Sequence, residues 1–538
     1  MSRINIIGAG LAGLSAAITL AESGTECNLF SLQPSERAQS VLAEGGINGA
    51  LDTMGEDDTV AEHYNDTLRG GVFMADPNAV HNLTSGAPGI IRWLEGLGVP
   101  FNMSGGELIL RNFGGQKKKR TAYARSSTGK IIMSAVIDEA RKYEASGLIR
   151  RYPHHEFLRL IIMDGECVGV RIRDCYSGRI ADFSGPVILC SGGMNGVFPG
   201  KTTGTTQNSG DVTATVFAQG SLLGNPEMVQ YHPTTIGISG KRCLVTEAAR
   251  GEGGRLWIMR KSDEPWYFME EKYPELKNLM PRDVVAREMF FVRRQEDCVG
   301  EVYLNMTELP EDTWKNKLSD LREELIKYLD IDPKYAPVPV HEGIHYFMGG
   351  IDTDELHRTN IRGLYAAGEC TCQYHGANRL GGNSMLGALF GGKKAAQTIL
   401  SGDNETIGCD DEPRYIDEYE PFAQEASPEL IERISDILLL GLGIIRSEEM
   451  LTKALSKLSV LEEEREYNQR ELNRFRLAQA MLRGALERRE SRGAHYREDY
   501  PERDERFRRT TVAQLKGGEV CISFRELPER RAENEDNT

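Results

Sequence analysis

The chain lacks the closely spaced cysteine groups that hold iron–sulfur clusters. Its ten cysteines are scattered along 538 residues, and only Cys370 and Cys372 lie close together. Neither a CxxC pair nor a ferredoxin-like run occurs, so we expect no metal site and no cluster bound by this chain alone. This cysteine pattern is typical of a protein in a reducing cytoplasm rather than of a disulfide scaffold.

The chain also has no long hydrophobic run and no excess of positive charge. Its longest apolar stretch, Ile437–Ile445, is about half the length that a membrane-spanning helix needs. A strand is predicted from Ile4, which leaves no room for a signal peptide, so we expect membrane contact only through a partner. With 64 basic against 80 acidic residues and a formal charge of −16, nucleic acid is excluded as a main partner. The one basic cluster, Lys117–Arg120, is either a solvated loop or an anion-contact loop.

What the sequence does contain is a nucleotide-binding opening. A predicted strand at Ile4–Ile7 is followed by the glycine run GAGLAG, a helix to Ser23 and a second strand at Glu26–Phe30. In such a βαβ unit the glycines let the backbone approach a pyrophosphate at the positive end of the helix. Ser31 stands where an acidic residue usually binds the ribose.

A second glycine-rich segment, residues 363–386, combines groups suited to a nucleotide and to an anionic substrate. Glu369 follows a predicted strand and is placed to bind a ribose hydroxyl. The guanidinium of Arg379 suits a carboxylate. A helix is predicted from Ser384, so one segment could contact both molecules.

Four further motifs between residues 231 and 350 concentrate polar side chains. They are YHPT from Tyr231, TEAARGEGG from Thr246, PRDVVAR from Pro281 and HYFMGG from His345. Each could be structural by itself, but their occurrence in this order indicates one site. The side chains that could hold the two ends of a dicarboxylate with charge-assisted hydrogen bonds are His232, Thr246, His345 and Arg379.

Together with the run RAQSVLAEGGIN at residues 37–48, these motifs resemble the flavoprotein subunits of fumarate reductase and succinate dehydrogenase, a family that includes L-aspartate oxidase. The resemblance extends from Gly8 to Pro501. It implies an α/β fold, in which a Rossmann-type FAD-binding domain is interrupted by an α+β capping domain and followed by a helical domain. The expected boundaries are 1–225 and 342–405 for the two parts of the FAD-binding domain, 226–341 for the capping domain and 415–500 for the helical domain. Residues 501–538 are expected to be a C-terminal segment with a charged, disordered tail.

The resemblance implies FAD as the cofactor. In the members that form membrane complexes, a histidine tethers FAD covalently at the position of Gln39, and glutamine cannot form that bond. We therefore expect non-covalent FAD, and the loss of the tether favours fumarate reduction over succinate oxidation. Asp211 would bond the flavin side chain or cap the helix that begins there. The expected cofactor-binding residues are Gly8, Ala9, Gly10, Gly13, Ser31, Gln39, Ser40, Glu44, Gly45, Gly46, Gly192, Asp211, Glu369, Ser384 and Leu386.

The family also implies which residues carry the chemistry. It assigns proton donation to the arginine matching Arg282, with a relay through Glu247 and Arg250. An arginine acid is reasonable if the reacting carbon is strongly basic and the relay reprotonates the guanidinium. A structural ion pair with Asp283 is the alternative. Phe113 lies in an RxFGG element that contacts the substrate in the reductases, whereas L-aspartate oxidases typically carry glutamate there.

The sequence thus predicts a flavoprotein that interconverts fumarate and succinate by hydride transfer. Its partner would be a separate iron–sulfur subunit, and it would lie in the cytoplasm or at the inner face of the cytoplasmic membrane through partners. Two enzymatic alternatives remain open. One is L-aspartate oxidase. The other is a reductase of another unsaturated carboxylate, because Phe347 takes a pocket-side position often held by threonine. A flavin-binding scaffold without substrate chemistry would lack catalytic residues, and none is missing.

Overall fold

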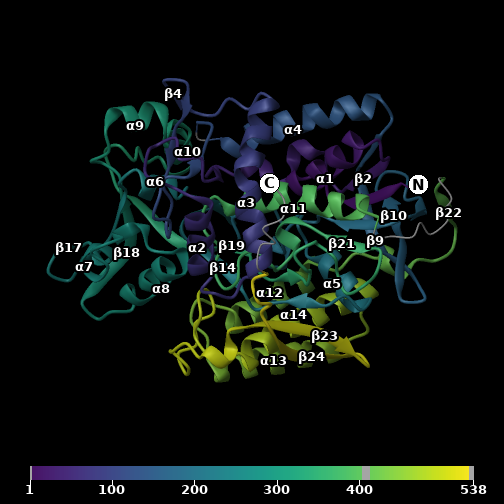
Figure 1. The fold of residues 1–538 in the computed structure, drawn as a ribbon. Helices are drawn as coiled ribbons and strands as arrows, with labels where there is room; N and C mark the ends of the chain where they lie inside the picture. The colour runs from purple at the N-terminus through teal and green to yellow at the C-terminus, as the bar shows by residue number, and fades with distance from the viewer. Residues whose placement is uncertain (1–2, 126, 403–411, 532–538) are drawn as a thin grey trace.

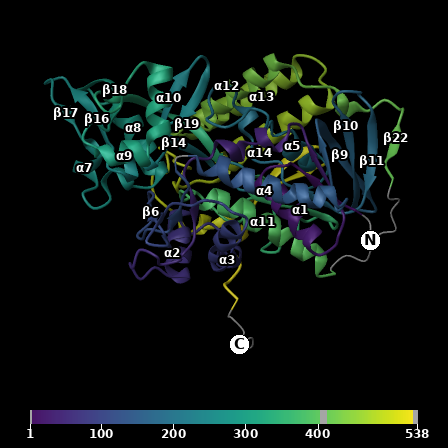
Figure 2. The same ribbon diagram turned by 90° about the horizontal axis from the view of Figure 1, so that it is seen from above.

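The structure is a computed structural model that describes residues 3–125, 127–402 and 412–531. Figure 1 shows a central α/β region, an outlying α+β region on one side of it in teal, and a helical region in yellow-green below. Figure 2 shows the outlying region projecting beyond one end of the central helices. The fold is α/β, as the sequence predicted.

A five-stranded parallel sheet forms the centre of the molecule. The strand order is β21-β12-β1-β2-β8, so β21 from the second predicted part of the FAD-binding domain joins four strands from the first part. The glycine turn after the first strand leads into α1, and α11 packs along α1, where the Ser15 hydroxyl donates to the carbonyl of Leu389. One face of this sheet is covered by a large apolar core. The elements are β1 (Ile4–Ile7), α1 (Leu11–Glu22), β2 (Cys27–Ser31), α4 (Thr128–Ala145), β8 (Ile149–Pro153), β12 (Val187–Leu189), β21 (Leu364–Ala366) and α11 (Asn383–Leu400).

An antiparallel sheet lies beside the parallel one. It contains β9 (His155–Met163), β10 (Glu166–Asp174), β11 (Ile180–Ser184) and β22 (Arg414–Ile416). The pair Asp164-Gly165 favours a hairpin, and both residues have positive φ in a tight turn between β9 and β10.

The outlying region is built on a six-stranded sheet with its own apolar core. We call this region, from β14 to β19, the cap. Its order is β15-β14-β19-β18-β16-β17, and β14 and β19 connect it to the central region. The elements are β14 (Val229–Ile238), β15 (Lys241–Leu244), α6 (Ala248–Gly251), β16 (Arg255–Arg260), β17 (Pro265–Trp266), α7 (Phe268–Lys272), α8 (Arg282–Val292), β18 (Cys298–Asn305), α9 (Glu311–Asn316), α10 (Ser319–Leu329) and β19 (Val338–Phe347).

Three helices form the helical region: α12 (Pro428–Gly441), α13 (Glu448–Glu463) and α14 (Gln469–Glu487). Most of the charged stretch from Glu463 to Glu490 forms the single helix α14, which begins at Gln469 and ends at Glu487. A capping box of Asn468 and Glu471 starts a new helix, because each side chain bonds the backbone N–H of the other residue. The chain therefore turns between α13 and α14.

The segment after this region is also more ordered than the sequence suggested. A hairpin of β23 (Arg509–Lys516) and β24 (Glu519–Glu526) joins β13 (Leu223–Gly224) and β20 (Gly350–Ile351) in a sheet. Of the predicted tail, residues 532–538 lie outside the described residues, as do residues 403–411 between the FAD-binding and helical regions. The predicted domain boundaries stay a prediction. No helix of the described chain is long and apolar enough to span a membrane.

Further helices and strands complete the central region. They are β3 (Ile47–Asn48), α2 (Val60–Gly70), α3 (Pro77–Gly96), β4 (Met103–Ser104), β5 (Glu107–Leu108), β6 (Leu110–Arg111), β7 (Thr121–Ala122) and α5 (Asp211–Ala218).

Candidate active site

A cavity of about 1190 Å³ lies between the central region and the cap. This is above the usual range of about 300–1,000 Å³ for ligand sites, so it has room for a cofactor and a substrate. The predicted site residues line it, with three exceptions. Gly13 lies behind the glycine turn, where an added Cβ would collide with the carbonyl oxygen of Gly8. Leu386 is buried in the core beneath the cavity, which corrects its assignment as a cofactor contact. Arg250 lies behind Glu247.

One end of the cavity fits a dinucleotide. Gly8 has φ of +112°, and an added Cβ would collide with the carbonyl oxygen of Cys190. Gly10 precedes α1 and has no side chain to cover the helix terminus, so the N–H groups there can face a pyrophosphate. The strand ends at Ser31 and Cys190 line the same space. These residues suit the pyrophosphate and ribose of FAD.

Glu369 lies where the sequence placed it, after β21. Its carboxylate accepts hydrogen bonds from the backbone N–H groups of Phe347, at 3.2 Å, and Gly193. Burial raises the pKa of this carboxyl to about 7, although these bonds and Arg379 oppose the shift. Near pH 7 both the ionised and the protonated form of this carboxyl are populated, so it can accept a hydrogen bond from a ribose hydroxyl or donate one to it.

Gln39 and Asp211 also line the cavity. The side-chain oxygen Oε1 of Gln39 accepts a hydrogen bond from the backbone N–H of Thr205 at 2.6 Å. Asp211 is the first residue of α5 rather than its cap, and its carboxylate forms an ion pair with Arg474 at 2.7 Å. The capping alternative for Asp211 is therefore wrong.

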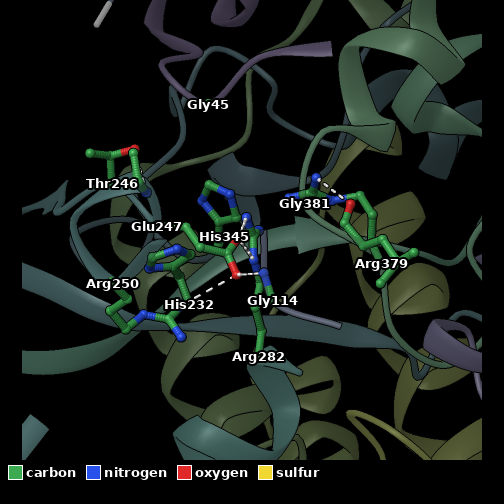
Figure 3. A network of polar contacts seen from close by, with 12 residues as sticks. Gly45, Gly114, His232, Thr246, Glu247, Arg250, Arg282, His345, Arg379 and Gly381 are labelled. Atoms are coloured by element: carbon green, nitrogen blue, oxygen red, sulfur yellow. Dashed lines mark hydrogen bonds and ion pairs between the residues drawn. The ribbon is translucent and has the colours of Figure 1, made fainter. Parts of the chain in front are cut away.

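The other end of the cavity is lined by the predicted substrate residues (Figure 3). The rings of His232 on β14 and His345 on β19 are 5.0 Å apart between centroids. His345 Nδ1 lies 2.7 Å from the hydroxyl of Thr203, and His232 Nε2 has no hydrogen-bond partner among the described residues. Burial, followed by the charge of Arg282, holds the pKa of each histidine well below its usual range. Both are neutral at pH 7.

A buried ion pair joins Glu247 and Arg282, the first residue of α8. Glu247 Oε2 accepts from Arg282 Nε at 3.0 Å and from Nη2 at 2.5 Å. The other oxygen accepts from the Gly114 N–H at 3.2 Å and from Arg250 at 3.4 Å. Burial alone would raise the pKa of this carboxyl, but Arg282 and Arg250 outweigh burial and hold the pKa below its usual value. Glu247 is therefore a carboxylate shared between two guanidinium groups.

Asp283 does not pair with Arg282. Its carboxylate lies 3.9 Å from Arg287, four residues further along α8, and Arg282 pairs with Glu247 instead. This argues against the alternative in which Arg282 and Asp283 form a structural pair.

Arg379 enters the cavity from the central region. Its guanidinium carbon lies 4.2 Å from the centroid of the Tyr346 ring, and its Nε has no partner among the described residues. Burial, together with Arg282, lowers the pKa of Arg379 to about 9. An anion between the two guanidinium groups would relieve their repulsion.

Phe113 is buried against the backbone of the cofactor segment. A Cβ on Gly45 would meet its ring at 3.2 Å, and a Cβ on Gly381 would meet it at 3.1 Å. Its ring lines the cavity and offers an apolar surface there.

A register shift explains why Phe347 does not share this surface. Along β14 and β19, Gln230 pairs with Tyr346 but the next residue, Tyr231, pairs with Ile344, so His345 is an extra residue. Such a bulge interrupts the alternation of side chains. His345 and Tyr346 line the cavity, whereas Phe347 is fully buried and stacks on Phe198. The pocket-side placement of Phe347 is wrong, and with it the reason for another unsaturated acid.

The sequence analysis missed Gln230. Its side chain accepts from Arg282 Nη1 at 3.2 Å and donates to the Arg379 carbonyl at 2.9 Å and to Asn378 at 2.8 Å. It therefore links the two arginines. Its position two residues before His232 was the only available signal.

Comparisons with known proteins agree with this geometry. A family model described as an FAD binding domain matches residues 4–385, and one described as fumarate reductase flavoprotein C-term matches residues 432–533. The succinate dehydrogenase flavoprotein subunit of Bacillus subtilis is 36% identical, over 95% of this chain and 94% of its own. An L-aspartate oxidase of Pyrococcus furiosus is 34% identical, over 95% and 99%. A mutant of FrdA from E. coli quinol fumarate reductase superposes with a TM-score of 0.85 at 26% identity, over 98% and 96%. The chain therefore belongs to the FAD-dependent oxidoreductase family of fumarate reductase and succinate dehydrogenase flavoprotein subunits.

Proposed function

We propose that this protein interconverts fumarate and succinate, with reduction of fumarate favoured. The observation that carries the proposal is the set of charges at one end of the cavity. Arg282 and Arg379 line this end and Arg250 lies behind Glu247, so three guanidinium groups surround the carboxylate of Glu247. The histidines are neutral, and burial raises the pKa of Glu44 to about 8, so that carboxyl is mostly neutral as well. Glu369, with a pKa of about 7, offsets part of the surplus, and the remaining excess of positive charge suits a dianion.

A dicarboxylate would bridge the central region and the cap. Arg379 would bind one carboxylate from the central side, while His232 and His345 donate to the carboxylates from β14 and β19. Thr246 and the Phe113 ring would border the carbon chain. Polarising one carboxylate leaves the double bond poor in electrons, and the walls exclude water from it.

FAD, when bound, supplies the hydride for one alkene carbon or accepts it in the reverse direction. Arg282 delivers the proton to the other carbon, which completes the addition of two hydrogens across the double bond. Glu247 holds Arg282 with two hydrogen bonds and contacts Arg250. A proton can pass along these three side chains to restore the Arg282 guanidinium.

FAD is bound without a covalent tether in this proposal, because Gln39 occupies the place of the tethering histidine. A non-covalent flavin supports the reductive direction. The protein would act in the cytoplasm or at the inner face of the cytoplasmic membrane, as the catalytic subunit of a complex with an iron–sulfur protein. Similar proteins named as flavoprotein subunits support this assembly.

The test uses the purified chain loaded with FAD and supplied with reduced viologen. Oxidation of the dye on addition of fumarate supports the proposal. A preparation that retains FAD but does not oxidise the dye with fumarate would contradict it.

L-aspartate oxidase is the second candidate, because a protein of that name is 34% identical over nearly the whole chain. An aminated substrate needs an acceptor for its ammonium group, and the apolar ring of Phe113 provides none. We therefore expect no peroxide from L-aspartate and oxygen in the same preparation. Peroxide formation at a rate comparable to fumarate reduction would favour this candidate.

A further inference from the structure

The helix that carries Arg282 has a second face that the reaction does not use. Val285, Met289 and Val292 are buried in the core of the cap. Arg287 and Phe291, four residues apart, lie on another stripe of α8. The side chains of this stripe contact the C-terminal segment rather than the core of the cap.

The contact is made by Tyr496. Its ring lies 5.0 Å from the guanidinium carbon of Arg287 and 6.1 Å from the Phe291 ring, which it meets edge to face at 80°. Such cation–π and edge-to-face contacts have a preferred geometry, so they orient the helix as well as holding it.

The backbone around Tyr496 is held in place by hydrogen bonds. Its carbonyl accepts from the Arg446 N–H at 3.0 Å. On one side His495 is fully buried and bonded to Arg446 and to the Arg488 carbonyl. On the other side Arg497 is fully buried, with its guanidinium bonded to Asp499 and to the Ala485 carbonyl. The segment is thus anchored on the helical region while its ring is presented to the cap.

We propose that Tyr496 is a positioning residue for Arg282: its ring contacts α8 and fixes the orientation of this helix when the cap encloses the cavity. Arg282 is nine residues from Phe291, or about 14 Å along a helix that rises 1.5 Å per residue. A tilt of about 5° at the far end therefore moves the Arg282 end by about 1 Å. A misplacement of that size in a reacting group can reduce a rate by up to about a hundredfold.

The inference rests on the proposed role of Arg282, but its test separates the two. We would compare Tyr496→Ala with Tyr496→Phe, since the Phe variant keeps the ring that contacts α8. Tyr500 is the matched control, because this tyrosine of the same segment packs instead against Arg497, at 5.1 Å. Each variant is prepared with FAD, and its fumarate kinetics are measured in H₂O and D₂O.

We expect Tyr496→Ala to lower kcat by about tenfold to a hundredfold. The KM for fumarate should change less than about twofold, because His232 and Arg379 lie on other elements. The solvent isotope effect on kcat should rise, since proton delivery becomes slower relative to other steps. Tyr496→Phe and Tyr500→Ala should behave like the unsubstituted protein. An unchanged kcat in Tyr496→Ala, or an equal loss in Tyr500→Ala, would overturn the inference.

Hydrogen exchange gives a readout that does not depend on the reaction. In Tyr496→Ala the amides of α8 should exchange faster while those of β16 and β18 do not. If Tyr496→Ala does not fold, Phe291→Ala removes the same contact from the cap side and should give the same pattern. A protein without fumarate activity would refute the proposed function. Unchanged hydrogen exchange in α8 of the Tyr496→Ala variant would refute the positioning role of Tyr496.

Discussion

Replacement of Arg282 tests the proposed proton donor most directly. The guanidinium makes three hydrogen bonds, two to Glu247 Oε2 and one to Gln230. Lysine could reach Glu247 or the cavity with one ammonium group but could not reproduce this fork. Alanine removes the donor and one of the positive charges at this end of the cavity.

The size of the effect follows from the role. A positioned acid contributes about 10²–10⁴-fold to a rate, which corresponds to about 3–5 kcal/mol of activation free energy. We therefore expect Arg282→Ala to lose at least about a hundredfold in kcat and Arg282→Lys to lie between it and the unsubstituted protein. The KM for fumarate should also rise in Arg282→Ala, because the site then has less positive charge. Glu247 keeps Arg250 as a partner, so the protein should still fold.

The assay is fumarate-dependent oxidation of reduced viologen, with bound FAD and the thermal midpoint measured on the same samples. Arg255→Ala is the matched control, since Arg255 pairs with Glu270 on the cap and does not line the cavity. If Arg282→Ala retains FAD and kcat remains within tenfold of the unsubstituted value, Arg282 is not the proton donor.

Three other predictions concern the cofactor and one buried histidine, His63. Gly8→Ala should lose most FAD binding in a titration followed by flavin fluorescence, because φ is +112° and the new methyl group collides with Cys190; affinity equal to the unsubstituted chain would contradict this. Acid precipitation should leave the flavin in the supernatant, and flavin in the washed pellet would show a covalent bond. Burial lowers the pKa of His63 to about 3, so in the folded state it is neutral while in the unfolded state it takes up a proton below about pH 6.5. The stability that it contributes is present above that pH and is lost as the pH falls, by about 2 kcal/mol between pH 7 and 5. His63→Gln should reduce the change in the free energy of unfolding between pH 7 and 5, measured by urea denaturation, by this amount, and an identical change would refute the reasoning.

The sequence predicted which glycines and strand ends meet at one end of the cavity because these are local signals. Gly8 and Glu369 lie where their motifs indicated, since a strand, a turn and a helix fix each of them within a few residues. Leu386 was assigned wrongly because a residue near a glycine-rich turn can face the core or the ligand. Its neighbour Met385 lines the cavity, whereas Leu386 turns into the core.

The end of the cavity proposed to bind the dicarboxylate was harder to predict because it depends on contacts between distant strands. A regular strand would place Phe347 on the same side as His345, and only the register shift against Tyr231 reverses that. Gln230 was missed because a glutamine without a motif has no chemical signature. Its function is visible only when Arg282 and Arg379, far apart in the sequence, are seen to share it.

The arrangement of charges also gives a reason for a cap that closes. Arg379 belongs to the central region, whereas Arg282 and Glu247 belong to the cap, so the positive charges that match the substrate come from both sides. Without an anion, Arg282 and Arg379 repel each other, and both contribute to the low pKa of His345. A dianion between them turns this repulsion into attraction and favours closure. Succinate and fumarate carry the two charges at the spacing of a short carbon chain. A monocarboxylate would neutralise only one side, so it should bind with the cap less fully closed and with Arg282 less well placed.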